Sequence, residues 1–337
     1  MNLAIYGAGS LGTILGAYIT KKGYDIDLIT RNESHIAGLK EKGAVIRGTI
    51  NMVVPVKAIT PNEMSKKYDI VFLLTKSTDN VNTVKSLIPY LTPNGVICTM
   101  QNGLPELLIA EIVGADRTYG CAIAWGATLI GNGVCELTSE PNSISFSLGS
   151  FSQNASREKI DTIKGILESM GTVEVEKNFI GARWSKLLIN SAFSGVSTVM
   201  GCTFGEAAKN KESRRCIQRI IKECIDVARK AEIRIEPVQG KDITKLFDYN
   251  SKIKKFISFH LLPLAIRKHK LLKASMLQDI EKGKKTEVDE INGAVCRFGS
   301  KYNVPTPYND MVVKIMHEIE AGTAKPGFEN LDRFTNL

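Results

Sequence analysis

The sequence has few of the features that mark specialised small proteins. Its 337 residues include only seven cysteines and four histidines, and no two cysteines form a CxxC pair. An odd number of cysteines without metal-ligand spacing argues against a disulfide framework and against a zinc site. We therefore interpret the cysteines as reduced thiols of a protein core and predict no metal.

Long, purely apolar runs are also absent. Two uncharged stretches, 118–135 and 187–205, contain Gly, Ser, Thr and Asn throughout, which is more typical of buried segments in a soluble protein than of membrane spans. The N-terminus has no basic region ahead of its apolar stretch, so no signal peptide is predicted. We expect a cytoplasmic protein with no membrane partner.

Acidic residues are missing from one segment, 251–273, which contains seven Lys and Arg residues. The chain has 44 basic and 35 acidic residues, a net charge of +9. Residues 1–150 have 12 of each, so the whole excess lies in 151–337, with 32 basic and 23 acidic residues. The basic segment is either the rim of a cleft that steers an anionic substrate and a phosphorylated cofactor, or a solvated helix face.

The length predicts about two domains. Strand and helix patterns alternate in the first half, which favours a parallel sheet with helices on both faces. The predicted strands are Leu3–Tyr6, Ile26–Thr30, Ile70–Thr75 and Val96–Met100, and the predicted helices are Ser10–Lys22 and Asp79–Leu91. Short strands between 119 and 149 suggest antiparallel additions at one edge, followed by a helix over 154–170 and a strand over 172–176.

Only helical patterns follow Phe179. The predicted helices are Ala182–Val199, Glu206–Ala231, Lys252–Lys273, Glu287–Tyr302 and Asn309–Glu320. We therefore predict an α/β, doubly wound Rossmann-type domain over 1–178 and an all-α domain over 179–337 that binds substrate and can support a homodimer.

A dinucleotide fingerprint occupies the first turn of the predicted sheet. Gly7-Ala8-Gly9-Ser10-Leu11-Gly12 matches GxGxxG and lies directly between a strand and a helix. Gly7 allows the tight turn, Gly9 lets the backbone approach a pyrophosphate, and Gly12 permits close packing of helix and strand. The N–H groups at the helix start then bind phosphate.

The end of the second strand bears on the choice of cofactor. NAD-binding proteins usually have Asp or Glu there to bind the ribose 2′-hydroxyl, whereas this chain has Thr30-Arg31-Asn32, and Asp27 comes too early. Arg31 can pair with a 2′-phosphate, with Thr30 and Asn32 adding hydrogen bonds and Lys76 adding charge. The sequence therefore favours NADP(H), although a solvated loop cation is the alternative for Arg31.

A polar line follows the domain boundary. Lys186, Asn190 and Ser194 are spaced at i, i+4 and i+8 on a helix that is otherwise apolar. A lysine desolvated there has a lowered pKa, which suits proton donation to a developing alkoxide. A lysine that extends from the helix surface to solvent fits the spacing equally well.

The other ionisable candidates carry no comparable pattern. The four histidines stand apart from any serine or acid at triad-like spacing, which indicates surface or core positions. The carboxylates around 279–290 are interpreted as helix-surface charges and caps, since no histidine accompanies them.

An ordered set of motifs spans most of the chain. They are Gly7–Gly12, Gln101-Asn102-Gly103, Trp184-x-Lys186-x-x-x-Asn190, Ser275-Met276 with Asp279, Thr286-Glu287-x-Asp289-x-x-Asn292-Gly293, and Val304-Pro305-Thr306-Pro307. Together they resemble the ketopantoate reductase family. The resemblance implies a helical domain of the 6-phosphogluconate dehydrogenase C-terminal type and an NADP-dependent oxidoreductase that reduces 2-dehydropantoate (ketopantoate) to pantoate for pantothenate and coenzyme A synthesis.

The resemblance also implies roles for individual residues. Lys186 would be the general acid, and Glu287 would orient Lys186 and the substrate. Asn190 and Ser194 would contact the substrate, and Ser275 would bind its carboxylate. Asn102 would bridge cofactor and substrate, and Ala127 would join the cofactor site.

Two departures concern the substrate side. Position 194 is Ser where the family usually has Asn, and the stretch between Asn190 and Ser275, which contains the basic segment, is longer than usual. They leave the identity of the 2-oxo acid open. The alternatives are an opine or 3-hydroxy acid type of dehydrogenase with another anionic substrate, and a non-catalytic NADP-sensing or nucleic-acid-binding protein. We expect a small 2-oxo acid partner and no nucleic acid, because a sensor needs no proton donor and the basic segment has few interleaved rings.

Overall fold

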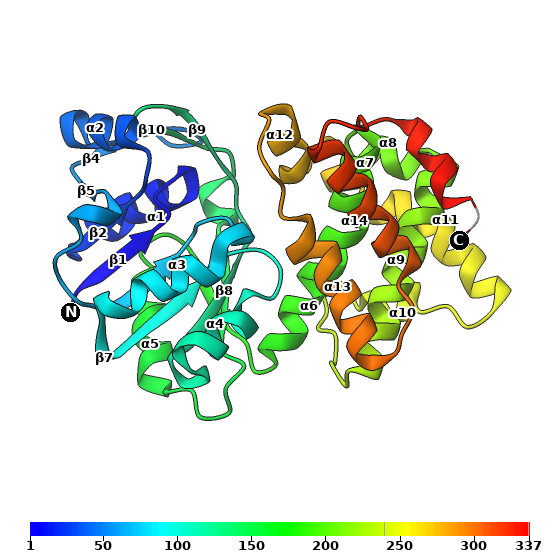
Figure 1. Cartoon of the computed structure of the whole chain (residues 1–337), viewed down its shortest axis with the longest axis horizontal. Coiled ribbons are helices and arrows are strands. Elements are labelled where there is room, and N and C mark those ends of the chain that lie inside the picture. The colour runs from blue at the N-terminus through cyan, green and yellow to red at the C-terminus, as the bar shows by residue number, and fades with distance from the viewer. Residues whose placement is uncertain (239, 336) are drawn as a thin grey trace. The chain divides into compact units, whose positions relative to one another are not determined.

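The computed structural model describes residues 1–238, 240–335 and 337. Two compact units make up the chain (Figure 1). Unit 1 consists of residues 1–101 and 105–179, and unit 2 of residues 102–104 and 180–337. The short segment Asn102–Leu104 thus belongs with the helical unit, although the chain on both sides of it belongs to the sheet unit.

Unit 1 is built on an eight-stranded sheet in the order β12-β11-β8-β7-β6-β1-β2-β5. All neighbouring strands are parallel except β11 and β8. The strands are β1 (Leu3–Tyr6), β2 (Ile26–Ile29), β5 (Lys57–Ile59), β6 (Tyr68–Leu73), β7 (Leu91–Thr99), β8 (Thr118–Ile123), β11 (Ser145–Gly149) and β12 (Thr172–Val175). The predicted parallel sheet is confirmed.

Strand β1 shows why helices cover both faces of the sheet. All four of its residues are buried, and they alternate between two apolar clusters. Leu3 and Ile5 pack in the cluster that includes residues of α1 (Ser10–Lys21) and α5 (Arg157–Leu167). Ala4 and Tyr6 pack in the other cluster with residues of α3 (Asn80–Leu87) and α4 (Pro105–Val113). Figure 1 shows these helices around the sheet.

The short strands predicted between 119 and 149 do not all join the edge of the main sheet as antiparallel strands. β8 runs parallel to β7, and only β11 is antiparallel to its neighbour β8. A separate four-stranded sheet, in the order β4-β3-β10-β9, takes up the rest. Its strands are β3 (Ala44–Gly48), β4 (Met52–Val54), β9 (Ala127–Gly131) and β10 (Val134–Leu137), and α2 (Glu33–Lys42) precedes β3.

A buried histidine contacts the turn of the β9–β10 hairpin, which pairs with β3 in the second sheet. Gly133 donates its backbone N–H to His35 Nδ1 at 3.0 Å, and His35 Nε2 lies 2.9 Å from Thr13 Oγ1. A Cβ on Gly38 of α2 would lie 2.4 Å from the carbonyl oxygen of Asn132, so the hairpin turn rests directly on that helix. Burial lowers the pKa of His35, which keeps the ring neutral in this structural role.

Unit 2 is helical throughout its described residues, apart from an isolated bridge between Val238 and Lys241. The helices are α6 (Phe179–Ile189), a π-helical segment (Asn190–Gly195), α7 (Val196–Met200), α8 (Phe204–Lys209), α9 (Lys211–Lys230), α10 (Ile243–Phe247), α11 (Lys252–Ala265), α12 (Ser275–Glu281), α13 (Val288–Tyr302) and α14 (Pro307–Glu320). The long helix α9 is central, because α7, α8, α10, α11, α13 and α14 all pack against it.

Two of the predicted helices are wrong in extent. The one over Glu206–Ala231 is broken at Asn210, whose side chain accepts hydrogen bonds from the N–H groups of Glu212 and Ser213 and so starts a new helix. The helix predicted to reach Lys273 ends at Ala265. Beyond it, the carbonyls of Lys270 and Leu272 accept backbone hydrogen bonds from the first turn of α8, which holds the chain there in a non-helical path. The helices α10 and α12 were not predicted.

Within the described residues, no helix is long and apolar enough to cross a membrane.

Candidate functional site

The glycine-rich loop of unit 1 connects β1 to α1. Gly7 has a φ of +107°, and a Cβ there would lie 2.4 Å from the backbone nitrogen of Thr75. A Cβ on Gly12 would lie 2.6 Å from the carbonyl oxygen of Gly7. Around Gly9, by contrast, nothing lies within 4 Å of the Cβ position. Two of the glycines therefore close the turn, and the third leaves its outer side open.

The open side of the loop fits a phosphate group. Gly9 is the N-cap of α1 and makes no side-chain cap, and the first turn, from Ser10 onward, contains no acidic residue. Its N–H groups and the positive end of the helix dipole suit an anion. The β-strand order also places this loop where the connections reverse direction between β1 and β6, which is where open α/β sheets bind ligands. The residues present thus fit a dinucleotide.

The side chains in and after β2 differ in whether they already have hydrogen-bond or ion-pair partners within the protein. Asn32 caps α2, with its Oδ1 accepting from His35 N–H at 3.1 Å. Arg31 is exposed and makes no hydrogen bond or ion pair with the residues that the structure describes. Asp27 is buried and forms ion pairs with Lys57 at 3.1 Å and Lys66 at 3.2 Å. Asp27 is thus part of the scaffold, and Arg31 is available.

Lys76 and Ala127 lie in other parts of unit 1. Lys76 follows β6 and Arg31 follows β2, and these strands flank β1 on opposite sides. The two cations therefore follow the two strands that flank the strand leading into the glycine loop. Ala127 begins β9, paired with Leu137 in the second sheet.

Gln101 has a structural role that its motif does not predict. Its buried amide nitrogen donates to the carbonyl oxygen of Thr75 at 2.9 Å and to Asn80 Oδ1 at 2.7 Å. Its amide oxygen accepts from Asn80 Nδ2 and from Thr99 Oγ1. This side chain joins the segments that follow β6 and β7, and so fixes the chain just before Asn102. A polar residue that follows a buried strand is the sequence feature that could have predicted this role.

In unit 2, Asn102 lies beside the start of α13. Its Nδ2 donates to Glu287 Oε2 at 3.2 Å. Gly103 has a φ of +82°, and a Cβ there would lie 2.2 Å from the carbonyl oxygen of Glu290. The neighbouring Thr286 is held by Glu320 Oε1, which accepts from its N–H and its hydroxyl at 2.7 Å each. The structure therefore brings together two of the predicted site residues, Asn102 and Glu287.

The predicted polar line runs along one continuous helix that changes its winding. Lys186 belongs to α6, while Asn190 and Ser194 belong to the π-helical segment. In an α-helix, each step of four residues advances about 40° around the axis. The wider π turn rotates less per residue, so the offset between Asn190 and Ser194 differs from the one between Lys186 and Asn190. Short π segments inside helices are rare and often occur at functional sites.

The remaining predicted residues come from helices that pack on this π segment. Both α12, which begins at Ser275, and α13, which follows Glu287, pack against it. Asn292 of α13 donates to the carbonyl oxygen of Ser191 at 3.0 Å. A Cβ on Gly195 would lie 2.7 Å from Asn292 Oδ1, so the close approach needs this glycine.

A chain of buried polar groups continues behind the π segment. Asn292 also donates to Asn309 Oδ1 at 2.9 Å, and Asn309 donates to Glu223 Oε2 at 2.7 Å. Glu223 further accepts the backbone N–H groups of Tyr308 and Asn309 at the start of α14. Burial raises the pKa of Glu223 to about 7, against these hydrogen bonds, which lower it. These groups position the helices. Asn292 belongs to one of the predicted motifs, whereas Asn309 and Glu223 were not predicted.

The cysteines are core residues, as the sequence predicts. Six of the seven cysteines are buried and the seventh is partly so, and all seven are free. Burial raises the pKa of Cys135 to about 11, which leaves it an inert core thiol. In the part of the chain that the structure describes, no group of three or more His, Cys, Asp or Glu side chains is placed to hold a metal ion.

Comparison with protein families gives two matches along the chain. The family model described as "Ketopantoate reductase PanE/ApbA" matches residues 3–150, and the one described as "Ketopantoate reductase PanE/ApbA C terminal" matches residues 178–320. A similar curated protein is the 2-dehydropantoate 2-reductase of Pyrococcus abyssi, 29% identical over 314 residues, which are 92% of this chain and 94% of that protein.

Solved structures are similar over nearly the whole chain. A ternary structure of D-mandelate dehydrogenase with NADH and anilino(oxo)acetate has a TM-score of 0.81 and 22% identity, covering 96% of this chain and 99% of that chain. The ketopantoate reductase of Ralstonia eutropha JMP134 has a TM-score of 0.80 and 20% identity, with the same coverage. At these identities the likeness establishes the fold, and the predicted fold class is confirmed.

Proposed function

Because the chain belongs to the ketopantoate reductase family, we propose that it reduces a 2-oxo acid with NADPH, and that this acid is 2-dehydropantoate. Membership makes the protein an oxidoreductase of the type that acts on CH–OH groups and uses a nicotinamide cofactor. The observation that carries the finer proposal is the Asn102–Glu287 hydrogen bond at the start of α13, since α13 and α12, which begins at Ser275, both pack on the π-helical segment that contains Asn190 and Ser194.

For the cofactor, the glycine loop supports a pyrophosphate on the open side of Gly9, at the start of α1. The residues assigned to it are Gly7, Ala8, Gly9, Ser10, Leu11 and Gly12. Arg31, exposed and without a partner among the described residues, is assigned to the 2′-phosphate of NADP(H). Lys76, Asn102 and Ala127 complete the predicted contacts. When bound, the nicotinamide supplies the hydride.

For the substrate, the residues predicted in unit 2 have separate roles. Lys186 Nζ donates the proton to the carbonyl oxygen of the 2-oxo acid, and its positive charge stabilises the oxyanion before that transfer. Glu287 orients Lys186 and the substrate, and the bond from Asn102 holds the carboxylate of Glu287 in place. Asn190 and Ser194 bind the far end of the substrate, and Ser275, exposed at the start of α12, binds the carboxylate.

A second substrate is favoured by one observation. Ser194 is buried in the π segment and offers a hydroxyl where the family usually has the longer amide of Asn. A shorter side chain leaves more room beside Asn190, which favours a bulkier 2-oxo acid. Reduction of such an acid, as in the D-mandelate type of dehydrogenase, is the second candidate.

The test is NADPH oxidation with a panel of 2-oxo acids, comparing the wild type with Lys186→Ala and Lys186→Arg. We expect 2-dehydropantoate to give the highest kcat/KM and Lys186→Ala to lower kcat by at least about 100-fold, the usual contribution of a general acid. Turnover of an aromatic 2-oxo acid without turnover of 2-dehydropantoate would establish the second candidate. Full activity of Lys186→Ala would remove the catalytic assignment. The homodimer and the cytoplasmic location stay predictions.

A further inference from the structure

A groove in unit 2 takes no part in the proposed reaction. It lies between the first half of α9 and the start of α11, beside Tyr308 of α14, and has a volume of about 530 Å³. That volume is within the range of small-molecule sites. The lining residues are Lys211, Arg215, Gln218, Arg219, Lys252, Lys255, Phe256, Phe259, His260 and Tyr308. We call this feature the α9–α11 groove.

The charge of the α9–α11 groove is of one sign. Five of its lining residues are Lys or Arg, and none is acidic. Arg215 has a carboxylate partner in Glu212 at 2.8 Å. Lys211, Arg219, Lys252 and Lys255 form no ion pair with any residue that the structure describes. Four cations without internal counter-charges therefore share one small space.

The cations are also close enough to affect one another. Burial first, and then the nearby guanidinium groups of Arg219 and Arg215, lower the pKa of the Lys255 ammonium group. Holding like charges together destabilises the fold unless an anion binds there.

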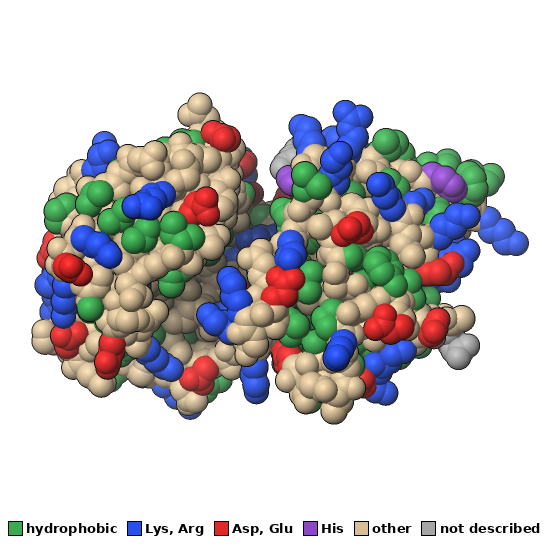
Figure 2. Space-filling model, turned by 90° about the horizontal axis from the view of Figure 1, so that it is seen from above, with side chains coloured by type: hydrophobic (Ala, Val, Ile, Leu, Met, Phe, Trp, Pro, Cys, Tyr) green, Lys and Arg blue, Asp and Glu red, His purple; other side chains and the backbone are tan. Residues whose placement is uncertain are grey.

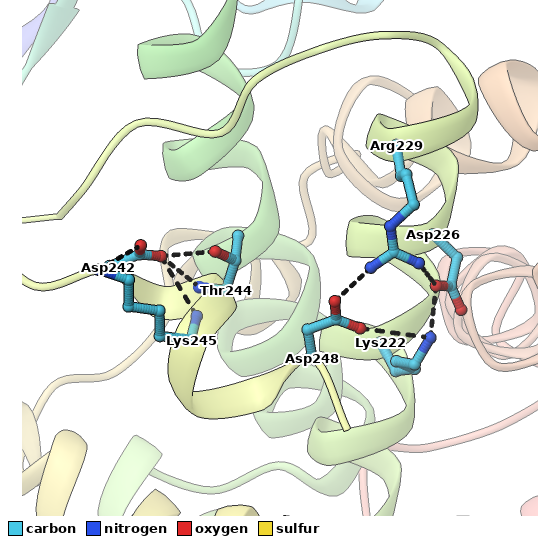
Figure 3. Close-up of polar contacts among 7 residues, drawn as sticks. All are labelled: Lys222, Asp226, Arg229, Asp242, Thr244, Lys245 and Asp248. Atoms are coloured by element: carbon cyan, nitrogen blue, oxygen red, sulfur yellow. Dashed lines mark hydrogen bonds and ion pairs between the residues drawn. The ribbon is translucent and has the colours of Figure 1, made fainter. Parts of the chain in front are cut away.

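A second charge cluster at the other end of α9 provides the contrast. Lys222 and Arg229 pair there with Asp226 and Asp248, so two cations face two carboxylates (Figure 3). Arg229 lies 2.9 Å from Asp226, and Lys222 lies 3.6 Å from Asp248. This cluster neutralises itself and needs no ligand, whereas the α9–α11 groove on the same helix does not.

The walls of the groove are held in place by buried contacts. Gln218 of α9 is 2% exposed, and its amide nitrogen donates to the carbonyl oxygen of Lys255 at 2.7 Å and to Ser258 Oγ. Arg214 stacks over the ring of Phe259 at 4.8 Å. The two helices are therefore fixed against each other at the depth of the groove, which gives a preformed site.

Rings accompany the cations. Phe256 and His260 stand next to each other on α11 with ring centroids 4.2 Å apart, and Phe256 is 66% exposed. The ring of Tyr308 lies 6.0 Å from the guanidinium of Arg219. Figure 2 likewise shows hydrophobic and cationic side chains side by side on the helical unit. An exposed phenylalanine at the mouth of a cationic groove offers a stacking surface to a planar ligand.

We propose that the α9–α11 groove binds a nucleoside polyphosphate, with the phosphates on Arg215, Arg219 and Lys255 and the base against Phe256 and His260. Arg215 and Arg219 are four residues apart on one face of α9, and two planar guanidinium groups suit adjacent phosphates. A groove of this volume takes one small ligand, which favours a nucleotide over a nucleic acid. This site is separate from the glycine loop and does not depend on the proposed reaction.

The experiment measures ADP binding to the full chain by calorimetry in 150 mM salt, with Gly9→Asp in the background to block the glycine loop with a carboxylate. We expect Gly9→Asp to retain one ADP site. Adding Arg215→Gln and Arg219→Gln should weaken that site at least tenfold, and adding Lys255→Gln, on the other helix, should weaken it as well. The matched control is Lys230→Gln, an exposed cation at the far end of α9, which should leave binding unchanged.

Two further ligands test the combination of ring and phosphates. Adenosine and inorganic pyrophosphate should each bind at least tenfold more weakly than ADP to the Gly9→Asp protein. The proposal is overturned if this protein binds no ADP, if the arginine and lysine changes leave its ADP affinity intact, or if pyrophosphate binds as tightly as ADP. Tighter binding of a short DNA duplex than of ADP, with a steep salt dependence, would overturn it in favour of a nucleic-acid surface.

Discussion

Asn102 and Glu287 are 185 residues apart in the chain, yet the Asn102 amide donates a hydrogen bond of 3.2 Å to the Glu287 carboxylate. The segment Asn102–Leu104 leaves the sheet unit to reach the start of α13 and then returns. Gly103 makes this approach possible, since any side chain there would meet the backbone of Glu290. The residue expected to touch the cofactor and the one expected to orient the acid are thus coupled directly.

This pair yields the first prediction. In a double-mutant cycle on kcat/KM, Asn102→Ala and Glu287→Gln should show a coupling energy of about 0.5–3 kcal/mol, as residues in one hydrogen-bonded network do. Asn102→Asp should lower kcat more than Asn102→Ala, because it sets two carboxylates against each other. Asn154→Ala, an exposed asparagine in unit 1, is the control and should change neither parameter. Additive effects would show that the bond has no catalytic role.

The second prediction concerns cofactor choice. Arg31→Ala should weaken NADPH binding about 10- to 100-fold, the equivalent of about 1.5–3 kcal/mol for a charged hydrogen bond, and leave NADH binding unchanged. Fluorescence titration with both cofactors measures this. Arg47→Ala removes another exposed cation of unit 1 and serves as the control. An equal loss for NADH and NADPH would contradict the assignment of Arg31 to the 2′-phosphate.

A matched pair of glycine changes separates folding from binding. Gly12→Ala should destabilise the protein by about 1–3 kcal/mol, because its Cβ would lie 2.6 Å from the backbone of Gly7. Gly9→Ala meets open space and should change stability by less than about 1 kcal/mol, while NADPH binding weakens about tenfold or more. Denaturant unfolding and cofactor titration measure the two effects. Unchanged NADPH affinity in Gly9→Ala would mean that the pyrophosphate lies elsewhere.

The fourth prediction follows from the buried carboxyl of Glu223. Its pKa is about 7 in the folded protein and near 4.5 when unfolded, so the folded state holds this proton more tightly. The free energy of unfolding should therefore fall as pH rises from about 4.5 to about 7, and this contribution should be constant above that range. In Glu223→Gln this dependence should disappear, together with about 1–3 kcal/mol of stability, because the amide offers one acceptor fewer to the α14 donors.

Urea unfolding at several pH values between 5 and 8 measures that difference. Glu158→Gln, on the exposed side of α5, provides the matched control and should keep the wild-type pH dependence. If wild type and Glu223→Gln lose stability in parallel over this range, another group is responsible.

The sequence predicted those features that depend on interactions between neighbouring residues. The glycine loop spans six residues between a strand and a helix, and its conformation follows from positive φ at Gly7 and close packing at Gly12. The fold class was also predictable, since β1 is apolar at every position and the second half has only helical periodicity. The order of the motifs along the chain predicts the family, and the matches at 3–150 and 178–320 confirm it.

Long-range contacts decided what the patterns did not. The β9–β10 hairpin has ordinary strand periodicity, and its pairing with β3, together with the contact of Gly133 with His35, assigns it to a second sheet. The helix predicted over Lys252–Lys273 ends at Ala265, and beyond it Lys270 and Leu272 accept backbone hydrogen bonds from the start of α8. The residues that make these contacts are distant in sequence, so a local pattern does not predict them.

The sequence by itself therefore determined the family, the two-part architecture and the cofactor loop, because each depends on neighbouring residues or on their order. Three features are known only from the tertiary structure. Asn102 donates a hydrogen bond to Glu287, and Asn190 and Ser194 belong to a π-helical segment. The cations of α9 and α11 line one groove. The physical reason is that burial, hydrogen bonding and charge pairing depend on which distant side chains meet, and that is decided when helices pack.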